Sequence, residues 1–197
     1  MRLLYSPASP YSAKCRMAAR HLGINLEEVN ATDGKEPPEL AGCNPLGKIP
    51  MLIRSGEVPL CDSVAIMHYF DRLSQGRLYP KRLEKRAEAE MLEALCDGIT
   101  DSLLCITYER RLRPEEKVYQ PWIDRHWVKV ARGLDYLENH VPKTEKKLNG
   151  GHFALAALIG YLHLRYAGRW SVGRPRLAAW PRQFSALFHE QKMKTAA

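Results

Sequence analysis

The positions of apolar residues divide the chain into a first part with strand-like and helical stretches and a longer second part with helical spacing only. Residues 2–5 form a short apolar run, and residues 10–22 follow with apolar positions at helical spacing. Gly23 supplies a stop for that helix, because glycine is favoured just past a helix end. Residues 26–29 then alternate between apolar and polar positions, which is typical of a strand.

Two further apolar runs and a helix complete the first part. Residues 51–53 and 58–60 flank the sequence RSGE, and this pattern predicts a hairpin. A helix is expected to begin at Asp62 and Ser63 and to run to about Leu73. Strand–helix–strand followed by strand–strand–helix gives a mixed sheet with a right-handed crossover. We therefore expect a thioredoxin-like α/β domain over residues 1–75, with a linker over residues 76–81.

The second part predicts an all-helical bundle over residues 82–197. No strand-like stretch of any weight occurs there, and residues 153–162 are apolar nearly all round, so we expect them to form the buried central helix. Helical spacing covers four stretches, residues 82–112, 115–139, 152–166 and 175–188.

Composition is that of an ordinary globular protein and argues against a membrane span. Of 197 residues, 45% are hydrophobic and 26% are charged. The longest apolar run, residues 153–164, is too short to cross a bilayer, and the first residues have no extended apolar stretch typical of a signal peptide. None of the five cysteines has the spacing of a metal site or of a CxxC motif, so we expect reduced thiols in a cytoplasm and no metal.

The net charge of +8 lies mostly in the second part of the chain. Residues 1–80 hold nine basic against eight acidic residues, whereas residues 81–197 hold 21 against 14. A basic surface favours anionic ligands or nucleic acid, but here opposite charges are interleaved along helical stretches. Because no nucleic-acid-reading motif accompanies them, a solvated helical surface is the favoured interpretation.

The stretch SPYS, residues 9–12, is the first candidate site. Ser9 falls where the first strand ends and the first helix begins, so it is either a helix N-cap, with Pro10 as the first helical residue, or a ligand-binding group. Free N–H groups at a helix start favour an anion such as a thiolate, and a serine hydroxyl there can donate to sulfur. We expect Ser12 to be structural and Cys15 to be a small buried apolar residue.

Two more clusters punctuate the first part. In NPLGKIPML, residues 44–52, Ile49 and Pro50 stand at the entrance to a strand, where proline suggests an edge or a special turn. Asp62 and Ser63 open a helix, and capping accounts for both of them. Alternatively, a serine hydroxyl with helix-end N–H groups would hold a carboxylate, and the aspartate would pair with an ammonium group, as an amino-acid head requires.

These three clusters together resemble signatures of the glutathione transferase superfamily. SPASPYSAKCR resembles its first strand–helix signature, NPLGKIPML its Asn-Pro…Ile-Pro stretch, and DSVAIMHYF its acidic-Ser-x-Ala-Ile helix. In the second part EALCDGITDSLL, YERRLRPEE and LIGYLHLR are similar to small serine-type bacterial cytosolic members, the YibF-like group. The resemblance covers nearly the whole chain and implies a thioredoxin-like domain followed by an all-helical domain.

The resemblance also implies roles for the first-domain residues. Ser9 would donate to the sulfur of glutathione and stabilise its thiolate. The backbone of Ile49 before Pro50 would pair with the cysteinyl moiety of glutathione. Asp62 and Ser63 would hold the γ-glutamyl head.

Further residues are implied for the two ends of the site. Lys35 and Lys48 would hold the glycine carboxylate of glutathione. Lys35 is placed by loop length, and a solvated lysine is the favoured alternative for it. An electrophile pocket between the domains would be lined by Tyr11, Leu104 and Tyr108, for which a core position is the alternative because aromatic residues at helical spacing are usually core.

The activity implied is conjugation of glutathione, as co-substrate, to small hydrophobic electrophiles in detoxification, or a related peroxidase or dehalogenase reaction. The alternative is a non-catalytic relative that serves as a protein-interaction module. A homodimer is also implied, and the apolar stretch of residues 91–108 is consistent with it.

Two departures from the family pattern stand out: Asn149-Gly-Gly-His152 replaces a Ser/Thr-x-x-Asp capping box, and the tail FHEQKMKTAA differs from the usual ending.

Overall fold

A three-stranded mixed sheet organises the first part of the chain. The computed structural model describes residues 1–32, 38–144 and 147–195. Strand β1 (Arg2–Tyr5) is central, parallel to β2 (Glu27–Asn30) and antiparallel to β3 (Met51–Ile53). Leu3 and Leu4 point to opposite faces of β1 and are both fully buried, so the sheet is covered on both sides.

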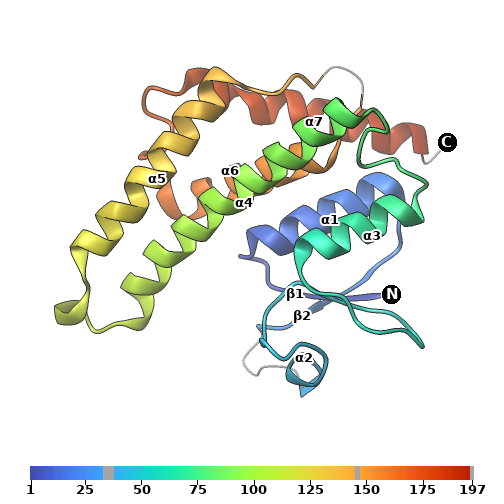
Figure 1. Ribbon diagram of the computed structural model, residues 1–197, viewed down its shortest axis with the longest axis horizontal. Coiled ribbons are helices and arrows are strands. Elements are labelled where there is room, and N and C mark those ends of the chain that lie inside the picture. Colours follow the sequence, from blue (N-terminus) through green and yellow to red (C-terminus); the bar gives the residue numbers. More distant parts are fainter. Residues whose placement is uncertain (33–37, 145–146, 196–197) are drawn as a thin grey trace.

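Helices cover the two faces of this sheet unequally. Helices α1 (Pro10–Leu22) and α3 (Ser63–Leu73) lie side by side on one face, and the short α2 (Pro38–Cys43) lies on the other (Figure 1). The sequence pattern did not predict α2, because its loop is rich in Gly, Pro and Asn. Leu40 of α2 nevertheless packs against the sheet beside Leu4, and this burial supports the short helix.

Helices are the regular elements in the described residues of the second part, as predicted. They are α4 (Leu83–Leu112), α5 (Gln120–Asn139), α6 (Gly150–Tyr166) and α7 (Pro175–Thr195). Helix α6 is buried on nearly every side, packs against α4 and α1, and is the expected central helix (Figure 1). Among the described residues no helix combines the length and the apolar character needed to cross a membrane.

Two local predictions were wrong in detail. The helix expected from residue 115 is only a 3₁₀ turn (Glu115–Lys117), and α5 begins afresh at Gln120. Pro121 explains the break, because proline fits the first turn of a helix but lacks the N–H needed further along. Of the expected hairpin, only Leu60 bridges to Leu52 of β3, so residues 58–60 form no second strand. The predicted domain boundaries at residues 75 and 82 stay predictions.

The start of α6 is better capped than its sequence suggested. The Asn149 side chain accepts from the His152 N–H at 3.2 Å, and Nδ1 of His152 accepts from the Asn149 N–H at 3.1 Å, so histidine completes the capping box in place of an acid. The two glycines between them are required by close packing. A Cβ at Gly150 would lie 2.5 Å from the Tyr79 ring, and one at Gly151 would lie 2.7 Å from the Ala89 carbonyl oxygen.

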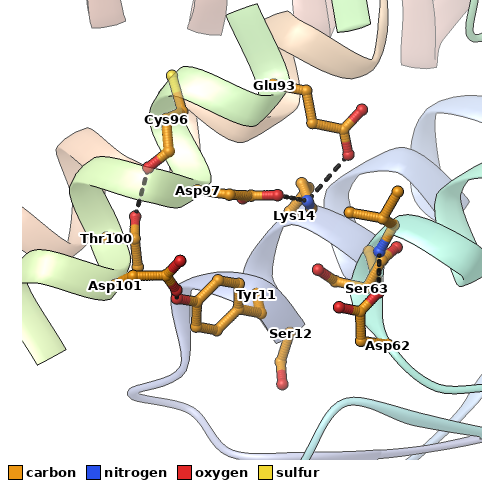
Figure 2. A network of polar contacts seen from close by, with 12 residues as sticks. Tyr11, Ser12, Lys14, Asp62, Ser63, Glu93, Cys96, Asp97, Thr100 and Asp101 are labelled. Carbon is orange, nitrogen blue, oxygen red and sulfur yellow. Dashed lines mark hydrogen bonds and ion pairs between the residues drawn. The ribbon is translucent and has the colours of Figure 1, made fainter. Parts of the chain in front are cut away.

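A buried ion-pair network joins α1 to α4 across the boundary between the two parts (Figure 2). Nζ of Lys14 lies 2.9 Å from a carboxylate oxygen of Glu93 and 2.7 Å from one of Asp97, while the Lys14 side chain is 1% exposed. The other Glu93 oxygen accepts from the hydroxyl of Tyr79. Burial lowers the pKa of Lys14, but the carboxylates of Glu93 and Asp97 outweigh it and raise the pKa above its ordinary value. Lys14 is therefore charged.

Replacing Lys14 tests this network. Lys14→Met leaves the Glu93 carboxylate buried without its cation, so we expect the free energy of unfolding to fall by about 3–5 kcal/mol. As a control, Lys85→Met removes an exposed ion pair to Glu88 and should cost less than about 1 kcal/mol. Urea denaturation measures both variants, and equal losses would contradict a structural role for Lys14.

The His152 cap predicts a pH-dependent stability. Burial lowers the pKa of His152 below its ordinary value, so the folded chain takes up its proton less readily than the unfolded chain. The stability is therefore complete above about pH 6.5 and is lost as the pH falls, by up to about 2 kcal/mol at pH 5. His152→Gln keeps a capping side chain without titrating.

Urea denaturation at pH 7 and pH 5 compares the two proteins. The loss of stability on acidification should be smaller in His152→Gln than in the wild type. His21, whose pKa burial lowers to about 4, is present in both proteins and serves as an internal reference. An identical loss in both proteins would show that the cap does not titrate as described.

Candidate functional site

A cavity of about 530 Å³ opens where the sheet domain meets the helical part. The loop after β1, the loop before β3 and the start of α3 form one wall, and α4 and α6 form the other. It brings together nine residues predicted from the sequence: Ser9, Tyr11, Lys48, Ile49, Pro50, Asp62, Ser63, Leu104 and Tyr108. The tenth, Lys35, lies outside the described residues.

Ser9 occupies the N-cap of α1 and also faces the cavity. Its Oγ accepts from the Ser12 N–H at 3.2 Å, and Pro10 follows as the first helical residue. This bond uses the oxygen of Ser9 as an acceptor and leaves its hydroxyl proton free to be donated. The capping and ligand-binding interpretations are therefore compatible, because one hydroxyl can serve both at once.

The loop before β3 presents backbone to the cavity. The Ile49–Pro50 peptide bond is cis. Asn44, which is 1% exposed, organises the loop from inside: its side-chain amide donates to the Lys48 carbonyl at 2.7 Å and accepts from the Leu46 N–H at 3.0 Å. The role of Asn44 was not predicted from the sequence, although its place in an Asn-Pro pair is typical of a residue that bonds to its own loop.

Asp62 and Ser63 stand at the start of α3. Oδ1 of Asp62 accepts from the Val64 N–H at 3.0 Å, so Asp62 is the N-cap, and its carboxylate remains exposed toward the cavity. Ser63 is buried, and its carbonyl lies 3.7 Å from the thiol of Cys15. A carboxylate beside a helix N-terminus suits a ligand with both an ammonium and a carboxylate group.

Tyr11 connects this wall to the opposite one. Its hydroxyl donates to the carboxylate of Asp101 on α4 (Figure 2). Burial and then the Asp101 carboxylate raise the pKa of Tyr11, so the phenol stays protonated. Tyr11 therefore lines the cavity with its ring while its hydroxyl is engaged by Asp101.

Neither Ser12 nor Cys15 adds a second nucleophile, in agreement with the sequence. Burial raises the pKa of Cys15 to about 12, which keeps it a neutral thiol. Ser12 is fully buried in α1, and its Oγ has no hydrogen-bond partner in the described part of the chain. In the same part of the chain, no group of three or more His, Cys, Asp or Glu side chains is placed to hold a metal ion.

Five cavity residues of the helical wall were not predicted: Asp101, Thr107, Arg111, Tyr161 and Arg165. A helical signal was available for some of them. Asp101, Leu104, Tyr108 and Arg111 follow one another at spacings of three and four residues, which places them on one face of a helix. The two predicted members of this series could have indicated the other two.

Two family models match the two parts of the chain. The N-terminal domain of glutathione S-transferases matches residues 3–78, and the C-terminal domain matches residues 120–180. A curated relative, the uncharacterized GST-like protein YibF of Escherichia coli, is 30% identical over 90% of each chain.

Solved structures agree in fold. A glutathione S-transferase of Methylobacillus flagellatus, solved with glutathione bound, is 32% identical and has a TM-score of 0.83 over 96% of this chain and 98% of its own. One from Methylobacterium radiotolerans, in complex with glutathione sulfonate, is 26% identical and has a TM-score of 0.86 over 96% of this chain and 93% of its own. The predicted fold class is confirmed, and the chain belongs to the glutathione S-transferase family.

Proposed function

We propose that the cavity binds glutathione, holds it as a thiolate and directs its sulfur to a small hydrophobic electrophile. The predicted enzyme class, a glutathione transferase, is confirmed by the family match. Glutathione as co-substrate agrees with the two solved relatives that hold glutathione or its sulfonate. The observation that carries the proposal is Ser9, whose hydroxyl proton is free at the N-terminus of α1 on the cavity wall.

The chemistry required of Ser9 is modest. A free thiol has a pKa of about 8.5, so a decrease of one or two units makes the thiolate abundant at neutral pH. A hydroxyl donor stabilises the anion directly, and the partial positive charge of the helix N-terminus adds to it. The enzyme needs no sulfur of its own at this position, because the reacting sulfur arrives with the co-substrate.

The other predicted residues are distributed as glutathione requires. In this proposal the Ile49 backbone pairs with the cysteinyl moiety, Asp62 and Ser63 hold the γ-glutamyl head, and Lys48, with Lys35, holds the glycine carboxylate. All but Lys35 lie on one cavity, which supports the assignment. Tyr11, Leu104 and Tyr108 would then contact the electrophile.

Peroxide reduction and dehalogenation use the same thiolate, and detoxification remains the role that we propose. The alternative, a non-catalytic interaction module, accounts less well for a cap residue with an uncommitted hydroxyl proton beside an open cavity. We place the protein in a cytoplasm, since all five cysteines are free thiols and a reducing compartment keeps them so.

We also propose a homodimer. In the single chain the apolar side chains of Val64 on α3 and Met91 on α4 are exposed, at 38% and 49%, which a two-fold interface would cover. Tyr108 and Leu104 from the same apolar stretch line the cavity instead, so only part of that stretch is available for pairing. Light scattering at micromolar concentration should give twice the 22.5 kDa chain mass, and a monomer mass would contradict the proposal.

Removing the Ser9 hydroxyl tests the proposed mechanism. Ser9→Ala should lower kcat for conjugation of glutathione to chlorodinitrobenzene by ten- to a hundredfold, roughly 1.4–2.7 kcal/mol of lost stabilisation. The dissociation constant of glutathione should change much less, because most contacts lie elsewhere.

The matched control is Ser12→Ala, which removes a hydroxyl from the same helix away from the cavity lining. It should leave kcat close to that of the wild type. Full turnover in Ser9→Ala, or an equal decrease of kcat in Ser12→Ala, would show that Ser9 does not stabilise the thiolate.

A further inference from the structure

The helical wall of the cavity carries two cationic side chains without a counter-ion. Arg111 lies in the last turn of α4 and Arg165 in the last turn of α6, and both line the cavity. Within the described ranges neither guanidinium makes an ion pair or a hydrogen bond. Both side chains are exposed, so each is available to a ligand.

The two arginines line the same cavity from two neighbouring helices, α4 and α6. A Cβ at Gly151, near the start of α6, would lie 2.7 Å from the Ala89 carbonyl near the start of α4. At the other end of α6, the Tyr166 hydroxyl donates to the Leu103 carbonyl of α4 at 2.9 Å. The two helices therefore run in the same direction, and the end of α6, with Arg165, lies beside the part of α4 that contains Leu103, eight residues before Arg111.

Among the described residues, the acidic side chains of the cavity form no ion pair with either arginine. Asp101 is ten residues before Arg111 on the same helix face, a separation of about 15 Å, and its carboxylate is engaged by Tyr11. Asp62 and Lys48 lie on the wall formed by the first domain. Between Asp101 and Arg111, the α4 face carries Leu104 and Tyr108, so an apolar section of α4 separates Asp101 from Arg111.

Helix electrostatics alone does not account for the arrangement. A basic residue in a last turn complements the partial negative charge of a helix C-terminus, and Arg110 meets that need in α4 as well as Arg111 does. Only Arg111 also lines the cavity. A variant of Arg110 is therefore the control that distinguishes an effect of position in the helix from an effect of placement in the cavity.

We propose that Arg111 and Arg165 form a subsite for a carboxylate group of the electrophile. This inference rests on the proposed function and narrows its substrate class to small electrophiles with an apolar body and an anionic end. The body would pack along Leu104 and Tyr108 while the carboxylate meets the guanidinium groups. Arginine suits this task, because its planar donors bind a carboxylate through two parallel hydrogen bonds.

Paired glutathione conjugates test the subsite without turnover. S-(4-carboxybenzyl)glutathione and S-(2-carboxyethyl)glutathione are each compared by calorimetry with the amide of the same shape. In at least one pair the carboxylate should bind about tenfold more tightly than the amide at low salt, as expected for a charge-assisted hydrogen bond. The preference should shrink as salt is added, because both arginines are exposed.

The double variant Arg111→Gln, Arg165→Gln should lose this preference, whereas Arg110→Gln should keep it. Because the three side chains are exposed, the variants should melt within a few degrees of the wild type, which thermal denaturation checks. The subsite is overturned if the wild type shows no preference in either pair, if the double variant keeps it, or if Arg110→Gln loses it equally.

Glutathione itself, titrated into every variant, separates the two levels of the proposal. If glutathione binds and the carboxylate preference is absent, only the subsite is wrong. If glutathione does not bind the wild type, the proposed function fails and the subsite fails with it.

Discussion

The position of the site depends on one buried cation, Lys14. It lies on α1, five residues after Ser9, and its ammonium meets Glu93 and Asp97 of α4 in a region where an unpaired charge would be costly. Burying the Lys14 charge away from water costs free energy, and this cost is compensated only when both carboxylates lie close to Nζ. The start of α1 is thereby held at a defined position relative to α4. Ser9 and the helical wall of the cavity consequently face each other in a fixed geometry.

The cavity combines two kinds of surface because two parts of the chain build it. The first domain contributes helix N-termini and loop backbone, with capping side chains at Ser9 and Asp62 that suit the polar groups of a peptide. The helices contribute side chains along one face of α4, from Asp101 to Arg111. Tyr11 links the two surfaces through its bond to Asp101. In the proposed function, the wall of the first domain recognises the polar groups of the co-substrate, and the helical wall selects the second substrate.

Sequence reasoning was accurate where the structure is local and weaker where it depends on distant contacts. Helix starts at Ser9 and Asp62 follow from cap chemistry within a few residues, and both were predicted. Lys14 and Asp97 are 83 residues apart, so their pairing could not be read from the chain, although the i, i+4 relation of Lys14 to the buried Ala18 places a charge on an apolar face. Similarly, α2 depends on the packing of Leu40 against the sheet, and this contact cannot be inferred from local helix propensity.

In the proposed mechanism, the N-terminus of α1 and Ser9 hold bound glutathione as a thiolate. The most direct test is a pH titration of the thiolate absorbance of glutathione bound to the wild-type protein, with free glutathione as the reference. We expect the pKa of the bound thiol to lie about one to two units below its ordinary value of about 8.5. A bound thiol that titrates with the same pKa as free glutathione would contradict it.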